Sequence, residues 1–125
     1  MEGPLREPVR VLFVCRLNRH RSATAERIFC KDPSLDVRSA GTAADAMVLV
    51  NARMLHWADV VFVMEQEHVR LLHDQFPGTP ALRRIVCLDI PDQYTFLDPE
   101  LIELLRARAT PHLDRLRAEH LLTEE

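Results

Sequence analysis

Short runs of apolar residues alternate with longer amphipathic stretches along most of the chain. The apolar runs are too short for helices, and their consecutive apolar positions are typical of strands buried on both faces of a sheet. This pattern predicts strands at 9–14 and 59–64, and we predict two further strands at 35–39 and 84–88. The stretches between them repeat apolar residues at helical spacing, as Val69, Leu72 and Phe76 do. They predict helices at 22–31, 51–57 and 65–76.

Proline marks the starts of the remaining predicted helices. Asp98 can cap a helix whose first turn contains Pro99. Thr110-Pro111 repeats this signal, which predicts that a separate last helix runs from there to Leu122. The alternation of strands and helices favours a parallel sheet covered by helices on both faces. In such sheets, ligands bind beyond the carboxyl ends of the strands.

Length and composition restrict the class of protein. The chain has 125 residues, a formal net charge of −3 and three cysteines. We predict a single domain over 1–125 with a flexible N-terminus at 1–8, because the chain is too short for two cores. The charge does not favour nucleic acid as a partner, and no apolar run is long enough to span a membrane. The start of the chain lacks the apolar core of a signal peptide, so we expect a cytoplasmic protein, as a monomer or a weak dimer.

The loop that follows the first predicted strand carries the candidate chemistry. Cys15 stands at the carboxyl end of the strand, and Arg21 stands where the next helix starts. The loop N–H groups and the positive end of the helix dipole can bind a tetrahedral oxyanion and favour the nucleophilic thiolate. Arg21 can bind two oxygens of a phosphoryl group. Ser22 can donate its hydroxyl to the sulfur, and Asn18 suits the left-handed backbone of a tight loop.

A second interpretation of these residues stays open. Arginine is abundant in this chain, and a cysteine in a buried strand is commonly an inert core residue. The strand–loop–helix context and the supporting positions of Asn18 and Ser22 favour the oxyanion site.

The same segment resembles the signature of the low-molecular-weight protein tyrosine phosphatases. The match consists of VLFVC at 11–15, Asn18, Arg21-Ser22, Ala25-Glu26, Ser39 to Thr42, 57–65 and Pro91 to Tyr94, in the family's order. The segment CLDIPDQYTFLDPEL at 87–101 is similar to a short bacterial branch of the family. With the alternation above, the resemblance implies an α/β three-layer sandwich. Its four-stranded parallel sheet would have the order 2-1-3-4.

The resemblance also implies an activity, that of a phosphomonoester hydrolase acting on phosphotyrosine in proteins. Cys15 would form a cysteinyl-phosphate intermediate, Arg21 would hold its oxygens, and Ser22 would assist the sulfur. The other substrate-binding residues would be Arg16, Leu17, Asn18, Arg19, His20 and Tyr94. No metal or other cofactor would be needed, because Arg21 and the loop supply the charge. The substrate would be a phosphorylated protein or a small anionic phosphomonoester.

The general acid is sought among three aspartates between the last strand and the last helices. The resemblance favours Asp92, which lies between Pro91 and Tyr94, although Gln93 replaces the usual proline. Asp89 is the second candidate. Asp98 is better explained as a helix cap.

Several positions depart from the family's pattern. His20 replaces a second cysteine that protects the nucleophile in many members, and Leu17 replaces a glycine. We expect Cys30 and Cys87 to be buried thiols. The segment 41–58 is shorter than in longer relatives, and we expect its Trp57 to pack on the core rather than against a substrate ring. Arg16 and Arg19 add positive charge beside Arg21, which raises the hypothesis of a more anionic substrate than phosphotyrosine alone.

Competing functions follow from the same residues. A thioredoxin-coupled arsenate reductase on this scaffold would need two further cysteines that relay a disulfide, and Cys87 stands alone in its region. A non-catalytic phosphate- or phosphopeptide-binding module would have no use for a thiolate together with an acid. A phosphocarrier would not need Arg21.

Overall fold

A four-stranded parallel sheet forms the centre of the structure, a computed structural model that describes residues 7–123. The strands are β1 (Val9–Cys15), β2 (Leu35–Gly41), β3 (Val60–Val63) and β4 (Ile85–Cys87). They pair in the order β2-β1-β3-β4, which confirms the predicted topology. The predicted flexible segment 1–8 lies outside the described residues except for positions 7 and 8.

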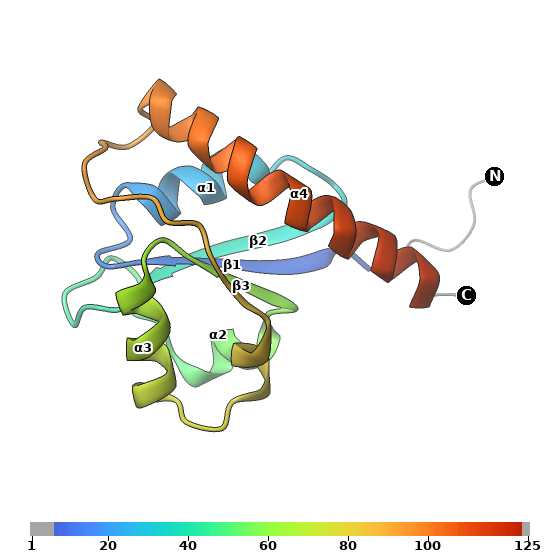
Figure 1. The fold of residues 1–125 in the computed structure, drawn as a ribbon, viewed down its shortest axis with the longest axis horizontal. Coiled ribbons are helices and arrows are strands. Elements are labelled where there is room, and N and C mark those ends of the chain that lie inside the picture. The colour runs from blue at the N-terminus through green and yellow to red at the C-terminus, as the bar shows by residue number, and fades with distance from the viewer. Residues whose placement is uncertain (1–6, 124–125) are drawn as a thin grey trace.

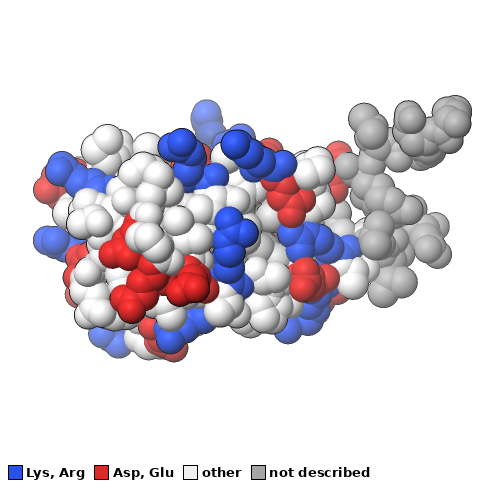
Figure 2. Space-filling model, turned by 90° about the horizontal axis from the view of Figure 1, so that it is seen from above, with Lys and Arg blue, Asp and Glu red and all other residues white. Residues whose placement is uncertain are grey.

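Helices cover both faces of the sheet and make three layers, as predicted (Figure 1). On one side lie α1 (Arg21–Phe29) and α4 (Pro99–Thr123). On the other lie α2 (Ala52–Trp57), α3 (Gln66–Gln75) and the short 3-10 helix η1 (Pro80–Arg84), which was not predicted. No helix within residues 7–123 is long and apolar enough to cross a membrane. Seen from the side of α1 and α4, acidic side chains gather toward one end and basic ones are scattered (Figure 2).

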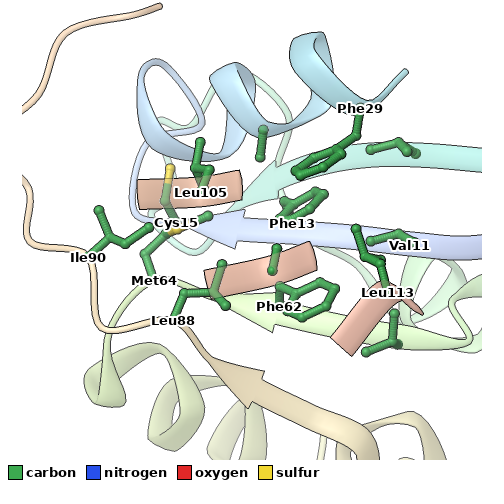
Figure 3. Close-up of a cluster of buried hydrophobic side chains, with 14 of the residues drawn as sticks. Val11, Phe13, Cys15, Phe29, Phe62, Met64, Leu88, Ile90, Leu105 and Leu113 are labelled. Carbon is green, nitrogen blue, oxygen red and sulfur yellow. The ribbon is translucent and has the colours of Figure 1, made fainter. Parts of the chain in front are cut away.

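The two faces of β1 supply two separate hydrophobic cores. Side chains alternate along a strand, so Val11, Phe13 and Cys15 share one face, while Leu12 and Val14 share the other. The ring of Phe13 stacks between those of Phe29 and Phe62, with centroid distances of 5.7 and 5.2 Å (Figure 3). Cys15 is therefore the last residue, at the carboxyl end of β1, of a strand face that is fully packed. The nucleophile candidate is held by a rigid core.

The last helix differs from the prediction, because α4 runs without interruption through Pro111. Proline removes one helical hydrogen bond and costs about 3 kcal/mol inside a helix. The helix continues because its apolar residues continue: Leu101, Leu105, Ala109 and Leu113 all have 0% exposure. Full burial of one leucine contributes about 1.5–3 kcal/mol. Packing beyond the proline thus offsets its cost, and the predicted break at Thr110-Pro111 is wrong.

Two other expectations have different outcomes. Cys30 is exposed at the end of α1 and Cys87 is half-buried, so the prediction of two buried thiols is wrong for Cys30. Its side chain follows the last turn of a surface helix and donates to the Arg27 carbonyl.

Trp57 is half-buried against the core of the α2 and α3 face, in agreement with its predicted packing role. The Arg38 guanidinium lies 4.2 Å from the centre of its ring.

Replacing Pro111 by alanine tests the continuous helix. We expect Pro111→Ala to raise the free energy of unfolding by about 1–3 kcal/mol, because it restores a hydrogen bond in the helix interior. Urea unfolding followed by circular dichroism measures the change. Pro99→Ala is the matched control, since Pro99 occupies the first turn, where its missing N–H costs little. A loss of stability in Pro111→Ala would show that the helix does not continue through this position.

Candidate active site

The loop between β1 and α1 lies at the carboxyl edge of the sheet, where the sequence predicts a site. It forms part of a small cavity of about 30 Å³, lined by Cys15, Leu17, Arg19, His20, Arg21 and Asp92. A volume of this size holds about two water molecules. The cavity suits a small tetrahedral group at its floor, with any larger group outside.

The sulfur of Cys15 is almost fully buried, with the residue 3% exposed. Its Sγ lies 3.1 Å from Ser22 Oγ and accepts a hydrogen bond from the Asn18 N–H at 3.3 Å. The Asn18 N–H can stabilise negative charge on sulfur, and the Ser22 hydroxyl can do so when its proton turns from the Ala40 carbonyl, which is 3.3 Å away, to Sγ. Cys15 also lies next to the amino end of α1, whose dipole acts in the same direction. The sulfur thus faces an N–H donor and the positive end of a helix dipole.

Asn18 holds the loop in shape. Its φ of 59° is the left-handed conformation that the sequence predicts for it. Its side-chain Nδ2 donates to Ser22 Oγ at 2.8 Å and to Ser39 Oγ at 2.9 Å. Ser39 in turn donates to the carboxylate of Glu26. Asn18 is 5% exposed and points into the protein, so its side chain supports the loop and does not line the cavity.

Arg21 is the largest buried polar side chain of the site and is 2% exposed. A buried guanidinium needs partners. Its Nη1 donates to Glu65 Oε1 at 2.7 Å and to the Ile90 carbonyl at 2.8 Å, and its Nη2 lies 3.7 Å from Asp92 Oδ2. The segments after β3 and after β4 therefore fix the direction of the guanidinium beside Cys15.

The end of β2 lies directly against the loop between β1 and α1, and Gly41 makes this possible. A Cβ at Gly41 would lie 2.6 Å from the Arg16 carbonyl oxygen and 3.1 Å from the Asn18 nitrogen. The neighbouring Thr42 N–H donates to the Cys15 carbonyl at 3.0 Å, and the Ala43 N–H donates to the Arg16 carbonyl at 3.0 Å. Any larger residue at position 41 would push the loop away from the sheet.

The three candidate acids are separated by the fold. Asp92 lines the cavity with a side chain that is 52% exposed. The Asp89 side chain accepts instead from Cys87 Sγ at 3.3 Å, outside the cavity. Asp98 accepts from the Glu100 N–H at 2.9 Å and caps α4. Of the three, Asp92 alone is placed to exchange a proton with a group bound at Cys15.

Sequence reasoning assigned no role to three residues that organise the site: Glu65, Ser39 and His68. Glu65 begins α3 with a capping box, in which His68 Nδ1 accepts from the Glu65 N–H at 3.1 Å. Burial and the nearby Arg21 charge lower the pKa of His68, so this imidazole is neutral at neutral pH. Glu65 closely follows the end of β3, at the same sheet edge as Cys15, and this position in the sequence could have indicated that Glu65 belongs to the site.

The remaining predicted binding residues fall into distinct places. Leu17, Arg19 and His20 line the cavity, and His20 Nδ1 is the one buried side-chain nitrogen or oxygen without a partner among the described residues. Arg16 is exposed and lines a neighbouring cavity. Tyr94, predicted to bind substrate, is 9% exposed, packs in the core of the α1 and α4 face and does not line the cavity.

Neither of the other cysteines lines the cavity. Cys15 belongs to one core and Cys87 packs against the other, across the sheet. Cys30 is exposed at the end of α1. In residues 7–123 there is no cluster of three His, Cys, Asp or Glu side chains arranged to bind a metal ion.

Solved structures with the same architecture exist, although no protein-family model and no curated protein matches the sequence. The YwlE arginine phosphatase of Geobacillus stearothermophilus is 25% identical, and the alignment covers 94% of this chain and 95% of that one with a TM-score of 0.65. Wzb of Vibrio vulnificus, solved with benzylphosphonate, is 22% identical over 86% and 98% of the two chains, with a TM-score of 0.71.

A third structure carries the family's name. The low-molecular-weight protein tyrosine phosphatase of Streptococcus pyogenes is 18% identical, with 86% of this chain and 93% of that chain covered and a TM-score of 0.72. The resemblance noted in the sequence thus extends to the three-dimensional structure. This chain has the fold of the low-molecular-weight protein tyrosine phosphatases.

Proposed function

We propose that the protein is a cysteine-dependent phosphomonoester hydrolase that acts on phosphotyrosine in proteins. One observation carries the proposal: the Cys15 sulfur and the buried Arg21 guanidinium line one small cavity together with Asp92. A nucleophile, a fixed positive charge and an acid are the groups that phosphoryl transfer requires. The solved structures of this fold include an arginine phosphatase and tyrosine phosphatases, which supports the same reaction type.

The reaction has two steps. The Cys15 thiolate attacks phosphorus and forms an S–P bond, while the P–O bond to the leaving group breaks and Asp92 gives its proton to the leaving oxygen. Arg21 and the loop N–H groups bind the equatorial oxygens in the transition state. In the second step, the Asp92 carboxylate takes a proton from water as the water oxygen attacks phosphorus. Inorganic phosphate leaves, and the Ser22 hydroxyl stabilises the departing thiolate at 3.1 Å.

The depth of the sulfur favours an aromatic phosphate ester as substrate. Cys15 is 3% exposed, and the cavity that it lines has a volume of only about 30 Å³. A phosphotyrosine can place its phosphorus there because the rigid ring extends it away from the peptide backbone. The complex of Vibrio vulnificus Wzb with benzylphosphonate, a phosphonate that carries a phenyl ring, supports a ring-bearing substrate by analogy. We propose that the protein acts in the cytoplasm.

The alternative functions find less support. An arsenate reductase would have to relay a disulfide from Cys15, which requires a second cysteine whose Cα lies within about 7 Å. Cys30 is exposed at the far end of α1, and Cys87 packs on the opposite face of the sheet. A binding module could use Arg21, but it would gain nothing from an exposed carboxylate beside the nucleophile.

The first test is hydrolysis of p-nitrophenyl phosphate. We expect the wild type to hydrolyse it between about pH 5 and 8 with inhibition by vanadate, and Cys15→Ser to be inactive, since it lacks the nucleophile. Cys30→Ser is the matched control, because its thiol is exposed and outside the cavity, and it should retain wild-type turnover. A wild type without activity across this range would favour the phosphate-binding module.

The second test concerns the proton donor. We expect Asp92→Asn to lower kcat/KM, which reports the first step, for phenyl phosphate by about 10²- to 10³-fold, because this leaving group needs a proton. The loss should be smaller for p-nitrophenyl phosphate, whose leaving group is a stable anion. Steady-state kinetics on both esters measure the difference. Asp89→Asn, which removes a carboxylate outside the cavity, should not change the ratio, and a ratio that is unchanged in Asp92→Asn would rule out Asp92 as the acid.

The third test concerns the carboxylate that orients Arg21. Glu65→Gln keeps an oxygen that can cap α3 but removes the charge from the 2.7 Å contact with Arg21. A hydrogen bond to a charged group contributes about 1.5–3 kcal/mol, so kcat/KM should fall by about tenfold or more. Kinetics combined with thermal unfolding separate this effect from a loss of stability. Asp74→Asn, on the exposed side of α3, should leave kcat/KM unchanged.

A further inference from the structure

A second cavity, of about 160 Å³, lies next to the catalytic loop, between the segment after β2 and α3. Its lining includes Arg16, Thr42, Glu67, His68 and Gln75. Arg16, which lines this cavity, directly follows Cys15, which lines the first one, although the two cavities share no lining residue. The second cavity is therefore within reach of a substrate whose phosphoryl group is bound at Cys15.

The backbone fixes the walls of this cavity relative to the nucleophile. The Cys15 carbonyl accepts from the Thr42 N–H at 3.0 Å, and the Arg16 carbonyl accepts from the Ala43 N–H at 3.0 Å. The opposite wall is α3, whose capping residue Glu65 binds Arg21. Both walls are thus tied to the catalytic loop, and a ligand in the cavity would lie in a fixed position relative to Cys15.

The cavity offers donors that have no partner inside the described part of the chain. Arg16 is exposed and forms no ion pair with any of residues 7–123, Glu67 included. His68 is 2% exposed, and its Nδ1 already accepts from the Glu65 N–H, which leaves Nε2–H as its donor. A guanidinium and a neutral N–H donor together suit a carboxylate. The carboxylate of Glu67 at the same cavity reduces the positive field and weakens this preference.

We propose that this cavity binds an acidic side chain adjacent to the phosphotyrosine of a protein substrate. The inference rests on the proposed function and names the substrate class of that site. Neighbouring residues of an extended peptide lie about 3.3–3.6 Å apart along the chain, so an acidic side chain one or two positions away can reach the second cavity. Arg16 is then the residue that selects the substrate. Arg19 lines the catalytic cavity and acts on the phosphoryl group, which every substrate carries.

The experiment compares two phosphotyrosine peptides that differ only in the flanking residues, glutamate in one and glutamine in the other. The readout is the ratio of their kcat/KM values at low salt. We expect the wild type to favour the acidic peptide about two- to fivefold, as for a partly solvated ion pair. Arg16→Gln should bring the ratio close to one, and Glu67→Gln should raise it above that of the wild type. Arg70→Gln removes the same charge from an exposed position of α3 and should keep the wild-type ratio.

Several outcomes would overturn the inference. These are equal rates on both peptides in the wild type, a ratio that falls in Arg19→Gln but not in Arg16→Gln, or a ratio that falls equally in Arg70→Gln. Hydrolysis of p-nitrophenyl phosphate without hydrolysis of either peptide would also overturn it. By contrast, a wild type that hydrolyses none of these esters would count against the proposed function itself.

Discussion

The site depends on one buried positive charge. Arg21 is 2% exposed, and a guanidinium in that position is stable only if its donors are satisfied. Its partners come from the segment after β3, where Glu65 begins α3, and from the segment after β4, where Ile90 supplies a carbonyl. Three segments that follow parallel strands thus meet at one side chain. The same contacts that satisfy the charge aim the guanidinium at the space above Cys15.

The loop itself is held by small and polar residues that tolerate unusual geometry. Asn18 takes a left-handed backbone and ties Ser22 to Ser39, and Gly41 lets the loop approach β2 to a distance that no side chain would permit. Below them, Cys15 ends the packed face of β1. A rigid floor, a fixed loop and a fixed guanidinium together hold the groups in position before any ligand binds, which is the condition for effective electrostatic catalysis.

Local features of the sequence predicted most of the fold. Short apolar segments bounded by loops indicated all four strands. The left-handed backbone of Asn18 was predicted because an asparagine side chain tolerates that conformation. Features that depend on distant contacts were missed. The helix through Pro111 continues because Leu113 is buried, and Tyr94 is turned into the core by the course of its loop. Glu65 lies 44 positions from Arg21, and this pairing exists only once β3 is next to β1.

The two carboxylates that contact Arg21, those of Glu65 and Asp92, suit different tasks because they lie in different surroundings. Glu65 Oε1 lies 2.7 Å from Arg21 Nη1 and Glu65 does not line the cavity, so it can orient the guanidinium but does not face a bound ligand. Asp92 lies 3.7 Å from the other guanidinium nitrogen and is 52% exposed, so solvent and a leaving group can both reach it.

Because the charge of Arg21 is already partly neutralised by these carboxylates, a bound phosphoryl dianion needs further positive charge. In the proposed reaction, the loop N–H groups and the amino end of α1 would supply it at the phosphorus, and Arg19 would add to it from the cavity wall. Arg16 lies beyond that wall, so its charge remains available to a different part of the substrate.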